Sequence, residues 1–435
     1  MKRKLTWIFA AVVPCLMMAS SSAGAQALGL EAEVEAARGG AGIPVGPGLW
    51  RLHGEDPNLG STEDLAPLRR MIGKATVVGL GESSHTVGGF YNMKHRIFRD
   101  LVETLGFRAF GIESHWVSGE KADRYVQTCE GSPEEALDSH ITVWQSVELS
   151  DLLRFMCEWN QAHPGDRVHY FGFDLQGAGL GPNVDGSGLI AFLGRTGIPE
   201  EHSWVSGIRA CEGVTVSHPF GQIPPEIHQQ CMAALAEIEG HFQRNGRSIE
   251  EQTSKDDFDR ARLQVLSLEA WQEETFFIAG DFAKGFNKRD EGMAKVFFHL
   301  REKNFPRAKT VIWGDNVHVA RAPGPTGLRS MGSYLAARLG RNYVTFALTA
   351  YHTEVETGAV VCQSEEAEPG SVEDRLHALG EDYLLVDLAR SSYVRPRVQK
   401  MGSLFLYQPR RQFNGILFLE TAERMQPIAW APCSE

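Results

Sequence analysis

The stretch at residues 77–113, VVGLGESSHTVGGFYNMKHRIFRDLVETLGFRAFGIE, decides the fold class. Residues 75–80 form a short β-branched run that is typical of a buried strand, and residues 108–113 form a second such run. Apolar residues recur at helical spacing over 89–105, and Gly106 stands where a C-cap glycine ends a helix. A strand, a helix and a strand in this order form a βαβ unit, which predicts an α/β fold with parallel strands.

The same patterns extend the prediction to the rest of the chain. Further strands are predicted at 168–173, 310–314, 343–349 and 383–388, with two short strands within 403–420. Between 174 and 310 the pattern is mostly helical, and long amphipathic helices are predicted over 225–244 and 255–285. We therefore expect an α/β fold, with a central, largely parallel β-sheet flanked by helices and with a helical insertion or subdomain. The predicted parts are a first core segment at 65–174, the insertion at 175–290 and a second core segment at 291–425.

The N-terminus has the pattern of a secretory signal peptide over residues 1–25. Three basic residues at 2–4 precede an apolar run at 5–19, and Ala-Gly-Ala at 23–25 fits the cleavage pattern. The apolar run is shorter than the roughly 20 residues of a membrane-spanning helix. We expect cleavage before Gln26, a periplasmic or secreted location, and no membrane association of the mature protein.

The composition of the chain limits the kinds of molecule that it can be expected to bind. Residues 26–64 are rich in Gly, Pro and acidic residues and are interpreted as a partly ordered leader. The net charge is −12 and no long basic run follows the N-terminus, which argues against a nucleic-acid partner and leaves a small-molecule substrate as the expected one.

Six cysteines remain after the signal peptide, and an oxidising compartment permits disulfides. The pairing and the oligomeric state are not readable from the sequence.

Four predicted strands end in polar clusters. The clusters are Gly81–His85 (GESSH), Glu113–His115 (ESH), Gly172–Asp174 (GFD) and Trp313–His318 (WGDNVH). In open α/β sheets, sites form beyond the carboxyl ends of the strands. If these strands are parallel neighbours, the polar side chains converge on one crevice. Buried carboxylates are costly, so several of them together indicate a functional site.

Motifs that are absent narrow the chemistry. The chain contains no GxSxG elbow, no HExxH helix, no GxxxxGK[ST] loop and no GxGxxG fingerprint. Ser83 and Ser84 are interpreted as turn residues and not as nucleophiles. Histidine titrates near neutral pH, so His85 is a suitable base for activating a water, and Glu82 or Glu113 is suited to orient its imidazole.

The stretch 77–113 resembles the erythromycin esterase family, in which GE-x-x-H is followed by a Leu-Val-Glu…Gly-Phe phrase and a strand that ends in Glu. The resemblance covers roughly residues 65–420. Supporting matches are Trp144 with the predicted helix 147–160, Phe-Gly-Phe-Asp at 171–174, Arg-Asp-x-x-Met-Ala at 289–294, Trp-x-x-Asn-x-His at 313–318, and Met-Gly-Ser-Tyr-Leu with Gly-x-x-Tyr at 331–343.

The resemblance implies a hydrolase that cleaves an ester or macrolactone, as in macrolide antibiotic resistance, without a cofactor. It implies that His85 is the base that activates water. Catalytic roles are expected for Glu82, His85, Glu113 and His318, and substrate-binding roles are expected for Lys94, Asp174, Arg289 and Asp315.

One position departs from the family pattern. In the family phrase His-Asn-x-His, the first histidine stands where this chain has Asp315. An ionised carboxylate accepts hydrogen bonds but donates none. A substrate other than a macrolide is therefore a real alternative.

Two other classes of function stay open. In the first, His85, Glu113, Asp315 and His318 bind a divalent metal such as Mn or Zn in a metal-dependent hydrolase or peptidase, as in the distantly similar Tiki-type peptidases with their Gly-x-x-His corner. In the second, the chain is a degenerate binding protein without catalysis. We expect hydrolysis without a metal.

Overall fold

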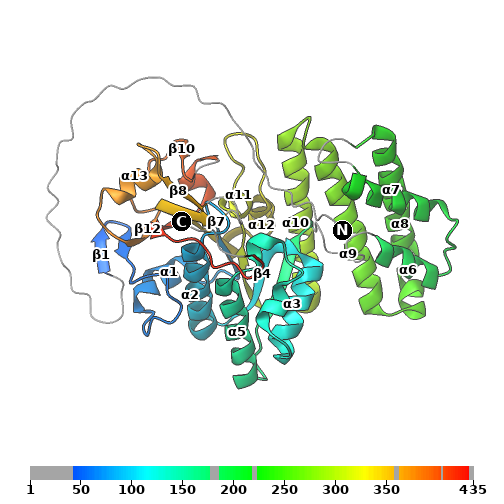
Figure 1. Ribbon diagram of the computed structural model, residues 1–435, viewed down its shortest axis with the longest axis horizontal. Coiled ribbons are helices and arrows are strands. Elements are labelled where there is room, and N and C mark those ends of the chain that lie inside the picture. Colours follow the sequence, from blue (N-terminus) through cyan, green and yellow to red (C-terminus); the bar gives the residue numbers. More distant parts are fainter. Residues whose placement is uncertain (1–42, 177–185, 218–222, 357–361, 403–404, 431–435) are drawn as a thin grey trace. The chain divides into compact units, whose positions relative to one another are not determined.

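A central sheet dominates this computed structural model, which describes residues 43–176, 186–217, 223–356, 362–402 and 405–430 (Figure 1). The predicted signal peptide and most of the predicted leader lie outside these residues. The strands of the sheet are β1 (Ile43–Gly46), β2 (Leu49–Arg51), β3 (Val77–Leu80), β4 (Phe107–His115), β5 (His169–Asp174), β6 (Lys309–Trp313), β7 (Tyr343–Glu356), β8 (Cys362–Glu366), β9 (Tyr383–Asp387) and β12 (Gly415–Ala422).

The strand order is β1-β2-β9-β12-β7-β3-β6-β4-β5, and β8 pairs with β7 outside this path. From β12 to β5 all neighbouring strands on the path are parallel. Strand β9 is antiparallel to both β12 and β2, and β8 is antiparallel to β7. The sheet is therefore mixed but mostly parallel, which confirms the predicted fold class.

The βαβ unit of residues 77–113 is present as predicted. Strand β3 leads into α2 (Gly88–Leu105), and β4 follows directly. Gly106 caps the helix with φ 69°, a left-handed conformation that glycine adopts without a steric cost. Strand β6 lies between β3 and β4, so this unit crosses over one position of the sheet.

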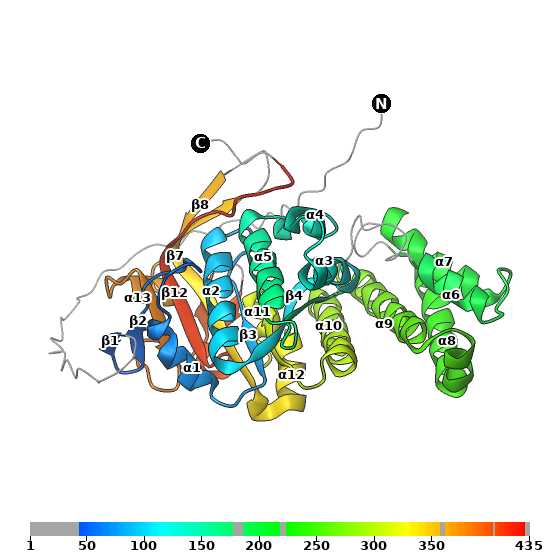
Figure 2. The ribbon, with the colours of Figure 1, turned by 90° about the horizontal axis from the view of Figure 1, so that it is seen from below.

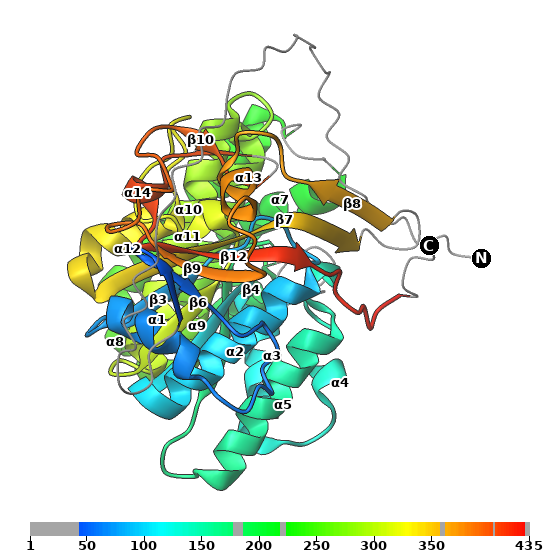
Figure 3. The ribbon, with the colours of Figure 1, turned by 90° about the vertical axis from the view of Figure 1, so that its left-hand side faces the viewer.

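Helices cover both faces of the sheet (Figure 3). Adjacent residues of β3 point to opposite layers, as strand geometry requires: Val78 belongs to one buried apolar cluster and Val77 to the other. The first cluster includes side chains of α1 (Ala66–Ile72), α2 and α5 (Val147–Ala162), and the second includes side chains of α10 (Phe282–Asn304), α12 (Met331–Leu339) and α13 (Val372–His377). The shorter helices α4 (Pro133–Leu137), α11 (Asn316–Val319) and α14 (Pro409–Gln412), and the longer α3 (Trp116–Thr128), complete this part.

Between β5 and β6 the chain is helical, and Figure 2 shows most of these helices to one side of the sheet. They are α6 (Ser187–Arg195), α7 (Ser203–Ser217), α8 (Pro225–Gln252), α9 (Lys255–Phe277) and α10. Helices α6 to α9 share an apolar cluster of their own, and the disulfide Cys211–Cys231 joins α7 to α8. The prediction of one helix over 255–285 was wrong, because α9 ends at Phe277 and Asp281 caps the start of α10.

Two segments, one before β3 and one after β9, differ from the structure that their sequence patterns predict. Strands β1 and β2 lie within the segment interpreted as a leader and extend the sheet beside β9. In the 403–420 region, β12 enters the sheet, whereas β11 (Leu406–Tyr407) pairs with β10 (Gln399–Lys400) in a separate two-stranded sheet. Within the described ranges, no helix is long and apolar enough to cross a membrane.

Candidate active site

The four polar strand ends lie side by side. Strands β3, β6, β4 and β5 are consecutive neighbours in the sheet and are parallel to one another. Their carboxyl ends therefore meet at one edge, which is where open α/β sheets place their sites. All eight side chains to which the sequence assigns a role in the site belong to one network of contacts at this edge.

Glu82 anchors the turn after β3. Its Oε1 lies 2.6 Å from His85 Nδ1, and its Oε2 accepts hydrogen bonds from Lys94 Nζ at 2.5 Å and Trp313 Nε1 at 2.9 Å. The preceding Gly81 is required by close packing, since a Cβ there would lie 2.1 Å from Asn316 Oδ1. Both carboxylate oxygens of Glu82 are thus engaged, and His85 is oriented through its Nδ1.

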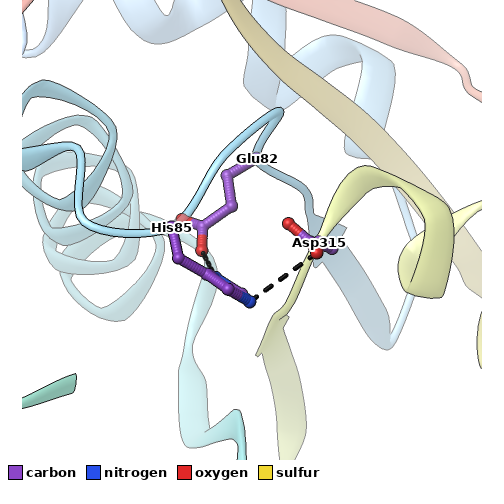
Figure 4. A group of neighbouring side chains, drawn as sticks. All are labelled: Glu82, His85 and Asp315. Carbon is purple, nitrogen blue, oxygen red and sulfur yellow. Dashed lines mark hydrogen bonds and ion pairs between the residues drawn. The ribbon is translucent and has the colours of Figure 1, made fainter. Parts of the chain in front are cut away.

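His85 and Asp315 face each other at the solvent side of the network (Figure 4). His85 Nε2 lies 3.6 Å from Asp315 Oδ2, and the two side chains are 29% and 26% exposed. The Trp144 ring packs edge-on against the imidazole with 4.9 Å between the ring centroids. The Asp315 carboxylate accepts no hydrogen bond from any residue in the described ranges, so it is available to a water or a substrate.

Glu113 lies deeper and joins the strand ends. Opposite β5, strand β4 has one extra residue between Ile112 and His115, and such a bulge redirects side chains at the end of a strand. Glu113 Oε1 accepts from Arg289 Nη2 at 2.9 Å, and Oε2 accepts from the Asp315 backbone N–H at 2.8 Å. Glu113 therefore positions the loop that carries Asp315.

Arg289 and His318 form the opposite side of the network from Glu82. Arg289 donates to both carboxylate oxygens of Asp174, at 3.0 and 2.7 Å. His318 Nδ1 lies 2.9 Å from both Asp290 oxygens, and its Nε2 lies 3.3 Å from Glu113 Oε1. The Phe286 ring stacks on His318 at 5.1 Å between centroids. Both cationic groups are thus held in fixed positions by carboxylates.

These contacts set the charge of the site. Burial lowers the pKa of His85, but Asp315 and Glu82 outweigh burial and raise it to about 10. Burial likewise opposes the charge of His318, whose pKa Asp290 and Glu113 raise to about 9. Burial disfavours ionisation of Glu113, yet His318 and Arg289 lower its pKa to about 2. At neutral pH His85 is therefore mostly imidazolium when the site holds no substrate.

The structure separates the predicted substrate-binding residues into two groups. Asp315 is partly exposed, as a residue that touches substrate must be. Lys94 and Asp174 are buried behind Glu82 and Arg289, and Arg289 itself is 11% exposed. Lys94 and Asp174 therefore hold other site residues in place, and they have no exposed surface through which to contact a substrate.

Several residues of the network were missed by the sequence interpretation. Asp290, which pairs with His318, follows Arg289 directly in the Arg-Asp-x-x-Met-Ala phrase, and an acidic residue on a buried helix face was the available signal. Trp144 and Trp313 stand in the quoted motifs, but nothing in the spacing showed that one packs on His85 and the other donates to Glu82.

The four proposed metal ligands do not form one free ligand set. They fall into two groups of neighbouring ligand atoms that share Asp315. One group is Glu113–Asp315–His318, and the other is His85–Asp315 together with Glu82. The oxygens of Glu82 and Glu113 are already bound by Lys94, Arg289 and other donors, and the Arg289 guanidinium lies 3.2 Å from His318 Nε2. A divalent cation would have to replace these fixed positive charges, so the residues present fit a metal poorly.

Comparison with known proteins identifies the family. The family model for erythromycin esterase matches residues 102–422. The chain belongs to the erythromycin esterase family. The matched residues include Glu113, Asp174, Arg289, Asp315 and His318, whereas Glu82, His85 and Lys94 precede the match. The chain is accordingly a hydrolase of this family.

Relatives of the erythromycin esterase family resemble this chain over most of its length. It is 23% identical to erythromycin esterase type II of Escherichia coli over 405 residues, which cover 85% of this chain and 94% of the relative. It is 24% identical to erythromycin esterase type I of Escherichia coli over 298 residues, covering 65% and 71%. A solved structure of a mutant of the erythromycin esterase EreC in its open conformation superposes with a TM-score of 0.69 at 18% identity, covering 85% and 97%, and shows the same fold.

Proposed function

We propose that this hydrolase cleaves a carboxylic ester or a lactone with a water molecule that His85 activates. The observation that carries the proposal is the arrangement of His85 itself. Its Nδ1 is held by Glu82, and its Nε2 points toward the exposed Asp315. An oriented imidazole on a partly exposed side chain is the geometry that a general base requires.

The proposed step is a direct attack by water on the acyl carbon. As the water oxygen forms its bond to that carbon, one water proton passes to His85 Nε2 and the carbonyl oxygen becomes negative. The tetrahedral intermediate then collapses, the bond to the leaving alcohol oxygen breaks, and that oxygen takes the proton back from His85. Asp315 accepts a hydrogen bond from the attacking water and so holds it beside His85.

The developing oxyanion needs positive charge close by. Lys94 is excluded by its full burial, and His318 is only 4% exposed, which leaves Arg289, 11% exposed, as the cationic side chain nearest to solvent. Arg289 is held in place before substrate binds, so stabilising the oxyanion requires little reorganisation. Groups of this kind contribute about 10²-fold or more to kcat.

We also propose that the protein is exported. The signal pattern of residues 1–25 carries this proposal, and two disulfides, Cys129–Cys157 and Cys211–Cys231, support it because such bonds persist in oxidising compartments. The other two cysteines of the mature chain, Cys362 and Cys433, lie outside the side chains that the structure describes.

The test is a substitution of the base. The purified protein is incubated with erythromycin, other macrolactones and 4-nitrophenyl butyrate, and products are examined by mass spectrometry for the addition of one water. We expect at least one of these compounds to be cleaved, and His85→Gln to lower kcat on it by about 10²-fold or more with little change in KM.

A matched control is available in His169→Gln. His169 is 34% exposed, similar to His85, but it lies at the amino end of β5, away from the site. This variant should keep the activity of the wild-type protein. A folded His85→Gln protein with wild-type kcat would remove His85 as the base, and absence of hydrolysis across the panel would refute cleavage of esters and lactones.

A further inference from the structure

A buried tyrosine connects the loop that carries His85 to the loop that carries Trp144. Tyr91 lies in the first turn of α2 and is 1% exposed. Its hydroxyl accepts a hydrogen bond from the Thr86 backbone N–H at 3.1 Å and donates to the Val143 carbonyl at 2.8 Å. Thr86 is the residue after His85, and Val143 is the residue before Trp144, whose ring packs on the His85 imidazole. One hydroxyl therefore joins the two loops that carry this ring pair.

The ring of Tyr91 adds contacts to both tryptophans of the site. It packs edge-on against Trp313 at 4.6 Å between centroids, and Trp313 donates to Glu82. It also lies at 5.8 Å from the ring of Trp144, which contacts His85. Tyr91 therefore touches the supports of His85 on both sides without contacting His85 itself.

The backbone that Tyr91 holds is in an unfavourable conformation. Thr86 has φ 64°, a left-handed conformation that is costly for a β-branched residue. Residues in such conformations persist where the surrounding structure fixes them, and they occur often at active sites. Thr86 is bonded directly to His85, so the contacts that fix the Thr86 backbone also limit where the His85 backbone and its imidazole can lie.

A second contact fixes the other side of Thr86. The segment after β12, the red coil in Figure 1, donates from the Met425 backbone N–H to the Thr86 carbonyl at 2.9 Å. The next residue, Gln426, donates its backbone N–H to Glu148 at 3.0 Å and accepts from the Val147 N–H at 2.9 Å. Thr86 is thus held by both of its backbone polar groups, and the Tyr91 hydroxyl is the side-chain member of this arrangement.

We propose that Tyr91 is a positioning residue for hydrolysis. Its hydroxyl holds the His85 loop and the Trp144 loop in a fixed position relative to each other. This inference rests on the proposed role of His85 as the base. A displacement of about 1 Å at a reacting group can cost on the order of 10²-fold in rate, so losing one hydroxyl at this place should affect turnover well beyond its effect on stability.

The experiment compares Tyr91→Phe with Tyr170→Phe. Tyr170 is equally buried, and its hydroxyl makes a hydrogen bond, 3.2 Å from His140 Nε2. Among the described residues, none of its hydrogen bonds or ring contacts reaches the site network. Both variants are measured for thermal unfolding and for kcat and KM on 4-nitrophenyl butyrate. We expect Tm to fall in both variants, and further in Tyr91→Phe because it loses two hydrogen bonds. We expect a fall of about tenfold or more in kcat for Tyr91→Phe alone, and little change in KM for either.

A second readout reports on the imidazole directly. With histidine labelled at Cε1, the NMR signal of His85 is assigned from its absence in His85→Gln. In the wild-type protein we expect this signal to be displaced by the ring current of Trp144 and to move toward the position of free imidazole in Tyr91→Phe but not in Tyr170→Phe. This readout needs no substrate.

The outcomes separate the two proposals. If His85→Gln lowers kcat while Tyr91→Phe leaves both kcat and the His85 signal at wild-type values, the positioning role of Tyr91 is refuted and the base is not. If His85→Gln retains full kcat, the proposed function fails, and the NMR signal alone then decides whether Tyr91 orients His85. A decrease of kcat in Tyr170→Phe equal to that in Tyr91→Phe would show a general effect of destabilisation and would also refute the inference.

Discussion

Asp315 places a second carboxylate beside the imidazole of His85. Glu82 already holds Nδ1, and Asp315 lies 3.6 Å from Nε2, the nitrogen that accepts a proton from water in the proposed reaction. The charge of Asp315 raises the pKa of His85, as do the hydrogen bond and the charge of Glu82, and the pKa reaches about 10 in spite of burial. The residue that we propose to hold the attacking water therefore also favours the protonated form of the proposed base at neutral pH.

This conflict predicts the pH dependence of the reaction. Because the base must be neutral, kcat/KM should rise with pH from neutrality toward about 10, the pKa of His85. Asp315→Asn removes a charge that raises this pKa, so its normalised profile should rise at lower pH, even if kcat itself decreases. Asp315→Glu keeps the charge and is the control, with an alkaline profile like that of the wild-type protein. Superimposable profiles for the wild-type protein and Asp315→Asn would show that Asp315 does not control the base.

At the scale of elements, the ends of β3, β6, β4 and β5 bring carboxylates together, and helices α2 and α10 place cationic side chains against them. Glu82 is bound by Lys94, and Glu113 is bound by Arg289, in both cases at hydrogen-bonding distance. The positive charge that a metal would supply is thus provided by side chains. This arrangement explains why a set of histidines and carboxylates with plausible metal-binding spacing fits a metal poorly.

The corresponding prediction concerns chelation. We expect activity on the best substrate to survive prolonged incubation with EDTA and dialysis, and added Mn²⁺ or Zn²⁺ to give no increase. Thermal unfolding measured with and without EDTA is the control for a structural ion, and Tm should not change. Loss of activity on chelation that Mn²⁺ restores would overturn the metal-free mechanism.

The elements also show what the sequence can and cannot predict. The βαβ unit of 77–113 was predictable because its periodicities and the cap at Gly106 are local. The insertion of β6 between β3 and β4 was not, because that pairing joins residues more than 200 positions apart, such as Val77 and Thr310. The convergence of the polar strand ends required only that these strands be parallel neighbours, which explains why the predicted residues came together although the strand order was unknown.

Contacts made by helices were harder to anticipate. Asp290 meets His318 because α10 packs beside the strand ends, and nothing in the spacing of residues 289–294 indicates that partner. Strands β1 and β2 were missed because they are only four and three residues long, and β1 contains proline and glycine, which carry little strand signal. Tyr91 looked like one more large residue on α2, since a hydroxyl that joins two loops leaves no pattern in the sequence.

At the scale of the whole molecule, the two disulfides lie in different parts of the fold. Cys129–Cys157 joins the end of α3 to α5 beside the sheet, and Cys211–Cys231 joins α7 to α8 in the helical region. They span 28 and 20 residues. In the chain-entropy model, closing loops of this size stabilises the folded state by about 3 kcal/mol each. A cytoplasm that keeps thiols reduced would forgo this stabilisation, whereas an oxidising compartment would retain it.

Export therefore predicts both a cleaved N-terminus and oxidised cysteines. N-terminal sequencing of the protein from its native host should begin near Gln26, which leaves 435 − 25 = 410 residues. Without a reductant, Cys129, Cys157, Cys211 and Cys231 should resist alkylation, and adding dithiothreitol should lower Tm because the folded state loses up to about 3 kcal/mol for each bond. The double variant Cys211→Ser/Cys231→Ser serves as the control, since reductant should lower its Tm by less than that of the wild-type protein. An intact Met1 terminus together with freely alkylated cysteines in the native protein would contradict export, because the signal peptide would then be uncleaved and the disulfides unformed.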